Sequence, residues 1–150
     1  PHIYVLDDET SPDGAKPEQW ASAAVSAYHK WGADALVAEI NNGGDMVESV
    51  IRTIPNGGRV HYVTVRATRG KYTRAEPISA LWEQGRGHMV GYYPELEDQL
   101  CTYVPGETDS PDRLDALVWG STLILGEEPA TVQVTSYAQR NFSTPQRPRR

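Results

Sequence analysis

Cysteine is almost absent from this sequence, since Cys101 is the only one in 150 residues. One cysteine cannot form a disulfide within the chain or a cluster of thiolate ligands, so a disulfide-stabilised scaffold and a zinc-thiolate site are excluded. This cysteine usage fits a reducing compartment. The few histidines lack the spacing of a zinc site, and no Ser-His-Asp order is apparent. They are His2, His29, His61 and His88.

Long apolar runs and an ATP-binding loop are also missing from the sequence. No run approaches the roughly 20 residues of a membrane span, and the first residues lack the basic-then-apolar order of a signal peptide. We therefore expect a soluble protein inside the cell. Because no glycine-rich phosphate loop is followed by Lys-Ser/Thr, the chain is not expected to hydrolyse ATP.

Positive charge is in deficit, with 14 Lys and Arg against 20 Asp and Glu and a formal net charge of −6. This balance argues against broad electrostatic adhesion to nucleic acid. It does not exclude an enzyme that clusters acids at a metal site and carries a separate basic strip.

Strands and helices are predicted to alternate along the chain. The predicted strands are 3–6, 35–40, 60–66 and 88–93, and the predicted helices are 17–31, 47–54, 73–82, 95–103 and 111–125. Such alternation favours an α/β domain with a central sheet between helices. The length suits one domain with a single core, which we place at residues 1–126. Residues 127–150 are predicted to form a flexible basic tail because their composition can bury little surface.

Two helix starts carry capping signals. In Thr73-Arg74-Ala75-Glu76 the threonine and the glutamate have the spacing of a capping box, and Pro77 is acceptable so close to a helix start. Ser110-Pro111 combines a capping hydroxyl with proline at the first helical position.

Glu39 is the most informative single residue, because it interrupts a nearly continuous apolar run from 35 to 40. A carboxylate in or at the end of such a strand is costly unless a cation or hydrogen-bond donors hold it. A hard divalent metal would do so. The alternative is a structural glutamate that accepts N–H groups of the 41–44 turn or pairs with an arginine.

Asp112 and Asp115 are three residues apart on the last predicted helix, and therefore on one face. That face points away from the apolar stripe of Leu114, Leu117 and Val118. The two acids could reach one metal, or they could only complement the positive end of the helix dipole.

Further charged residues admit two interpretations each. Asp7 and Asp8 end the first strand, where they would add a third carboxylate beside Glu39 or cap the next loop. A group of basic residues lies around Gly70 and Gly87. These residues would contact the phosphates of a nucleic acid, or they would simply be exposed to solvent. Its members are Arg66, Arg69, Lys71, Arg74, Arg86 and His88.

Four segments in order resemble the nuclease domain of the terminase large subunit of tailed phages. The stretch 38–47, Ala-Glu-Ile-Asn-Asn-Gly-Gly-Asp-Met-Val, resembles its strand-to-helix signature. The stretch 66–77 resembles its Arg-Gly-Lys and Arg-Ala-Glu-Pro element, and 96–99 its Leu-Glu-Asp-Gln element. The stretch 110–119 resembles its closing Asp-Arg-x-Asp-Ala-Leu helix. Together the segments cover roughly residues 3–125.

The resemblance implies a ribonuclease H-like α/β fold with a central mixed sheet flanked by helices. It implies a metal-dependent endonuclease that cuts concatemeric viral DNA during packaging with two Mg²⁺ or Mn²⁺ ions. Glu39 matches the strand acid and Asp112 the acid of the last helix, while Asp115 binds metal or orients a water. Arg69, Lys71 and Arg74 would face DNA. The implied partners are double-stranded DNA, the terminase ATPase domain, the small terminase subunit and the portal, in the host cytoplasm.

One departure from the family concerns its first metal-binding aspartate, which lies on a strand before the segment that 3–6 resembles. The sequence begins after that point, so the site is expected to be incomplete or to use Asp7 or Asp8 instead. A catalytically inactive module that docks on the portal or the ATPase domain is therefore one alternative. A junction-resolving nuclease of the same fold is another.

Overall fold

A computed structural model describes residues 1–40, 45–66, 71–104, 111–126 and 135–136. The helices are α1 (Pro17–Trp31), α2 (Asp45–Thr53), the short 3-10 helix η1 (Gly57–Arg59), α3 (Lys71–Glu83), α4 (Pro94–Thr102) and α5 (Asp112–Leu125). The strands are β1 (Ile3–Val5), β2 (Leu36–Glu39), β3 (Tyr62–Val65), β4 (Gly87–Met89) and β5 (Thr135–Ser136). The alternation predicted from the sequence is confirmed.

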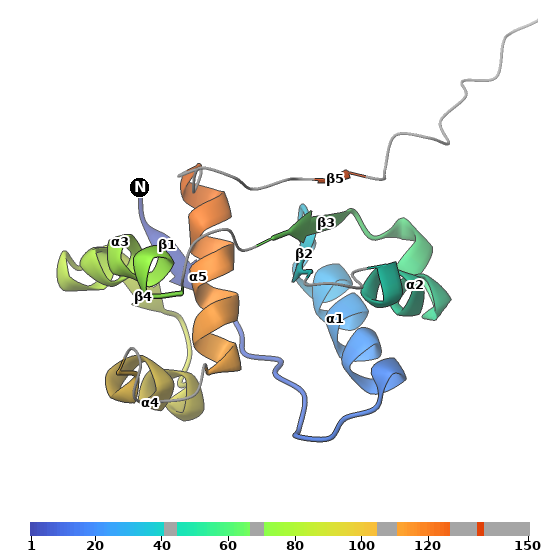
Figure 1. Cartoon of the computed structure of the whole chain (residues 1–150), viewed down its shortest axis with the longest axis horizontal. Helices are drawn as coiled ribbons and strands as arrows, with labels where there is room; N and C mark the ends of the chain where they lie inside the picture. Colours follow the sequence, from blue (N-terminus) through green and yellow to red (C-terminus); the bar gives the residue numbers. More distant parts are fainter. Residues whose placement is uncertain (41–44, 67–70, 105–110, 127–134, 137–150) are drawn as a thin grey trace, which may run out of the picture.

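The strands form two small sheets rather than the one central sheet that was expected. β1 pairs with β4 in parallel, with Ile3 opposite Gly87. β2 pairs with β3 in parallel, with Glu39 opposite Val65, and β5 is antiparallel to β3. Figure 1 shows α5 running between the two sheets. The helix packs Leu114 and Val118 against Ile3 of β1, and its Trp119 donates a hydrogen bond to Glu39 of β2.

The buried apolar residues form two clusters where the sequence suggested a single core. One cluster joins β1, α3 and α5 through Ile3, Ile78, Leu81, Leu114 and Val118. The other joins α1, α2 and the β2–β3 sheet through Ala21, Val25, Ile51, Val60 and Tyr62. Two clusters follow from the position of α5, which lies between the two groups of elements.

The first helix follows its sequence pattern at both ends. α1 spans Pro17–Trp31, with proline in the first turn and Gly32 in the left-handed conformation at φ 59°. The backbone N–H of Gly32 returns to the carbonyls of the last turn. A glycine adopts this positive φ without the steric cost of a Cβ atom, so the helix ends where the sequence predicts.

Both predicted capping signals need correction. α3 begins at Lys71, so Thr73 lies within its first turn instead of before it, and Pro77 lies well inside the helix. The start differs by two residues from the one expected, which is the usual uncertainty when a helix end is placed from local signals. In α5 the cap residue is Pro111, with no side-chain hydrogen bond. Ser110, the predicted capping hydroxyl, lies outside the described residues.

Two residues of the predicted flexible tail, Thr135 and Ser136, pair with Thr64 and Val63. The rest of the predicted tail lies outside the described residues, so its flexibility stays a prediction. Mutual hydrogen bonding with an open edge of β3 accounts for the pairing.

Among the described residues, no helix combines the length and apolar character needed to cross a membrane.

Candidate functional site

The acids singled out in the sequence reach one region from two elements. Glu39 is the last residue of β2, and the neighbouring Ile40 N–H donates to the Val65 carbonyl at 2.8 Å, which ties the strand end to β3. Asp112 and Asp115 occupy the first turn of α5. The carboxyl end of a half-buried strand and the start of a helix therefore supply the three side chains.

These three acids line a common hollow of about 300 Å³ between β2 and α5. The α5 residues that face it recur at intervals of three and four, as expected for one face of a helix. The full lining is Val37, Glu39, Asp112, Asp115, Ala116, Trp119 and Gly120. The opposite face of α5 carries Leu114 and Val118 into the apolar cluster with β1 and α3.

Glu39 accepts a hydrogen bond from the indole of Trp119. The distance from Trp119 Nε1 to Glu39 Oε2 is 3.0 Å, and Trp119 is 5% exposed. This donor was not among those weighed from the sequence, which were an arginine and the N–H groups of 41–44; the latter lie outside the described residues. The signal for it was present, because Trp119 follows Asp115 by four residues and so lies on the same helix face.

Arg74 lies behind the hollow and is 6% exposed. Its guanidinium carbon is 4.3 Å from the centre of the Trp119 ring, and its Nη2 is 3.9 Å from Asp115 Oδ1. The sequence predicted that Arg74 faces DNA phosphate, whereas the side chain is directed to α5. The reason is its phase on α3, four residues before the buried Ile78.

The other residues predicted to contact DNA are only partly described. Lys71 is the first residue of α3, and its side chain lies outside the described part of the structure, as does all of Arg69. Their DNA contacts stay predictions. Arg86 donates to the Pro1 carbonyl at 2.9 Å, and His88 stacks on Tyr4 at 4.7 Å between ring centres.

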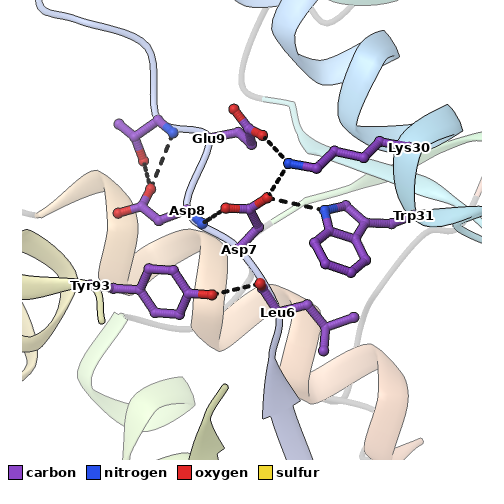
Figure 2. A network of polar contacts seen from close by, with 8 residues as sticks. Leu6, Asp7, Asp8, Glu9, Lys30, Trp31 and Tyr93 are labelled. Carbon is purple, nitrogen blue, oxygen red and sulfur yellow. Dashed lines mark hydrogen bonds and ion pairs between the residues drawn. The ribbon is translucent and has the colours of Figure 1, made fainter. Parts of the chain in front are cut away.

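Asp7 and Asp8 do not line the hollow, and both are held by other groups (Figure 2). Asp7 accepts from Lys30 Nζ at 2.7 Å and from the Trp31 indole at 3.2 Å. The hydrogen bond from Lys30 is the main reason that the pKa of Asp7 is below its usual value, and Trp31 acts in the same direction. This aspartate is therefore ionised and paired at neutral pH.

Asp8 is paired with a residue of α5, since Arg113 Nε donates to Asp8 Oδ2 at 2.8 Å. Burial raises the pKa of Asp8, but hydrogen bonds from Thr10 and Arg113 outweigh it and leave that pKa below its usual value. Asp8 thus contacts α5 one residue away from Asp112, on a different side of the helix from the hollow.

The donor chemistry of the hollow fits a hard divalent cation, because carboxylate oxygens are the ligands that Mg²⁺ and Mn²⁺ prefer. The side chains are not drawn together into a closed ligand set. Among the described residues, no three His, Cys, Asp or Glu side chains form a group close enough to hold a metal ion. Metal binding at this place would need water and phosphate oxygens as further ligands, which Mg²⁺ commonly keeps.

A family model described as the terminase RNaseH-like domain matches residues 2–122. The chain belongs to this family. The resemblance found in the sequence is thereby confirmed, and the match includes all three acids of the hollow. Membership of the terminase RNaseH-like family indicates a nuclease role in phage DNA packaging. No curated protein and no solved structure matches the chain.

Proposed function

We propose that this terminase RNaseH-like domain is a metal-dependent endonuclease that cuts concatemeric viral DNA during packaging. The observation that carries the proposal is the hollow in which Glu39, Asp112 and Asp115 meet. A pair of Mg²⁺ or Mn²⁺ ions bound there would activate water and stabilise charge on the leaving oxygen. The setting is the host cytoplasm, where DNA concatemers are cut.

Each acid has its own part in this proposal. Glu39 is held at the end of β2 by the Trp119 indole, so its carboxylate is fixed in the hollow before any ligand arrives. Asp112 is exposed and has no hydrogen bond or ion pair to another described residue, so its carboxylate is available to a cation. Asp115, one turn further along α5, either binds metal or orients a water.

DNA would approach the hollow from the side of the α3 start. Arg69 and Lys71 lie at or just before that helix and supply positive charge for phosphates. We retain Arg74 in the DNA-facing set only as a long-range charge, because its guanidinium is buried against Trp119. The proposed partners are double-stranded DNA, the ATPase domain, the small terminase subunit and the portal.

A second candidate function is favoured by one observation. The acids of the hollow do not form a metal-ligand group among the described residues. A catalytically incomplete domain that docks on the portal or the ATPase domain would need no such group. This candidate predicts binding to the motor without cleavage.

Nicking of supercoiled plasmid tests the proposal. The parent chain is expected to nick DNA with Mn²⁺ or Mg²⁺ and to stop when a chelator is added. Glu39→Gln and Asp112→Asn are each expected to lose at least about 100-fold in rate, because a metal ligand contributes several kcal/mol to the transition state.

The matched controls change an exposed acid outside the hollow. Glu83→Gln and Asp13→Asn make the same chemical replacements and are expected to nick at the parent rate. An inactive parent chain with intact portal or ATPase-domain binding would favour the second candidate. Full activity in both hollow variants would exclude the proposed site.

A further inference from the structure

Trp119 places the one polar atom of its side chain on a carboxylate of the hollow. The ring is 5% exposed, and its Nε1 lies 3.0 Å from Glu39 Oε2. An indole N–H is a donor only, and a buried one almost always has an acceptor. Here the acceptor is on a different element, so the hydrogen bond joins α5 to the end of β2.

This hydrogen bond leaves the other carboxylate oxygen of Glu39 open. No further hydrogen bond or ion pair to Glu39 is present among the described residues. A donor on one oxygen restricts rotation of the carboxylate about its last torsion, which is otherwise broad. The second oxygen is therefore held in one direction, as a carboxylate that binds a metal requires.

Arg74, on α3, packs against the Trp119 ring. Its guanidinium carbon is 4.3 Å from the centre of the Trp119 ring, and its Nη2 is 3.9 Å from Asp115 Oδ1. A planar guanidinium over an indole gains cation–π attraction, and burial strengthens it. Arg74 therefore contacts two α5 residues of the hollow, Trp119 and Asp115.

We propose that Trp119 is a positioning residue that orients the Glu39 carboxylate for metal binding, and that Arg74 fixes the indole in the required orientation. The proposal rests on the metal-dependent nuclease function above. It assigns Trp119 and Arg74 no contact with substrate. It also explains why the sequence places an arginine on the buried face of α3.

Calorimetric titration of the full chain with Mn²⁺ tests the proposal without relying on activity. Trp119→Phe keeps a ring and removes the donor, and it is expected to weaken Mn²⁺ binding about tenfold, as loss of a group that orients a ligand commonly does. In a Glu39→Gln background the same change is expected to alter affinity less than about twofold, because the carboxylate to be oriented is gone. A purely structural role of Trp119 predicts equal effects in the two backgrounds.

Trp31→Phe is the matched control. Like Trp119→Phe, this change removes an indole N–H that donates to a carboxylate, since Trp31 Nε1 is 3.2 Å from Asp7 Oδ2. The Trp31–Asp7 pair, however, lies outside the hollow. Its Mn²⁺ affinity is expected to equal that of the parent. A Trp31→Phe loss as large as that of Trp119→Phe would overturn the specific role of Trp119.

Arg74→Lys covers the case in which Trp119→Phe fails to fold. Lysine keeps the charge but not the planar contact, so we expect about threefold weaker Mn²⁺ binding with a parent-like circular dichroism spectrum. Parent affinity in Arg74→Lys, or in a folded Trp119→Phe, would overturn the positioning proposal. The nuclease proposal would survive if Glu39→Gln alone lost binding, and both would fail if the parent bound no Mn²⁺.

Discussion

Acidic side chains gather on two sides of α5, and the two groups differ in what neutralises them. We call Asp7, Asp8 and Glu9 the loop acids, and Glu39, Asp112 and Asp115 the hollow acids. Every loop acid has a cation close by: Lys30 is 2.7 Å from Asp7 and 3.0 Å from Glu9, and Arg113 is 2.8 Å from Asp8 (Figure 2 shows the Lys30 pairs).

Two of the hollow acids, Glu39 and Asp112, have no cation within ion-pair distance among the described residues. Glu39 has an indole hydrogen bond, whereas Asp115 lies 3.9 Å from Arg74. Asp112 is exposed, with no hydrogen bond or ion pair among the described residues. A carboxylate that is already paired gains little from a metal, whereas one without a close cation gains much. The comparison therefore identifies Glu39 and Asp112 as acids available to bind metal.

The largest expected difference between the two groups is in DNA cleavage. Asp115→Asn is expected to reduce Mn²⁺-dependent plasmid nicking about 100-fold, because the change removes a negative oxygen from the proposed metal site. Asp8→Asn makes the same replacement among the loop acids and is expected to stay within about threefold of the parent rate. An equal loss in both would show that Asp8 belongs to the metal site.

A smaller effect is expected on stability when the Asp8–Arg113 pair is broken. The two side chains are 13% and 25% exposed, so Asp8→Asn should lower the free energy of unfolding at pH 7 by about 1 kcal/mol in urea titrations. Asp98→Asn, an exposed acid on α4, serves as the control with no expected change.

Asp8 also makes the stability depend on pH, through its hydrogen bonds from Thr10 and Arg113. Because the folded-state pKa of Asp8 lies below its usual value of 3.8, the ionised form stabilises the fold. This contribution is complete above pH 3.8 and is lost as the pH falls through the folded-state pKa. The stability gap between parent and Asp8→Asn should therefore narrow as the pH falls below 3.8, measured by urea unfolding at each pH. A gap that widened in acid would contradict the lowered pKa of Asp8.

The smallest effect is expected at Lys30, which is 53% exposed. Lys30→Gln removes the cation shared by Asp7 and Glu9, but solvent screens such pairs strongly. The midpoint of thermal unfolding should fall less than in Asp8→Asn, and the difference from the parent should vanish in 1 M salt. A salt-independent loss would mean that Lys30 stabilises the fold by packing.

Local patterns predicted the elements better than their assembly. The apolar stripe and Gly32 were enough to predict α1 at both ends, and the interrupted apolar run pointed to Glu39. The split into two sheets was not predictable, because it depends on α5 packing against both sides. Strands of two to four residues carry too little periodicity to reveal their partners.

The candidate site was predictable in its acids and not in the residues that hold them. Glu39 and Asp112 stand out because each is a charged residue beside apolar ones, and a charge near a core is costly unless a partner holds it. In the sequence, Trp119 has the ordinary interpretation of an aromatic core residue and Arg74 that of a surface cation. Only the helix face on which each residue lies indicates a different role. The contact between Arg74 and Trp119 joins α3 to α5. Such a contact depends on how the two helices pack, which the local spacing of residues does not reveal.

The most direct measurement is iron-directed cleavage of the protein backbone. Fe²⁺ replaces Mg²⁺ at carboxylate sites, and with ascorbate and peroxide it cuts the polypeptide nearby, which mass spectrometry can map. The account predicts cuts around Glu39 and across Asp112 to Trp119, suppressed by excess Mg²⁺ and absent in Asp112→Asn. Cuts at Asp7 and Asp8, or no Mg²⁺-sensitive cuts at all, would contradict the assignment of the metal to the hollow.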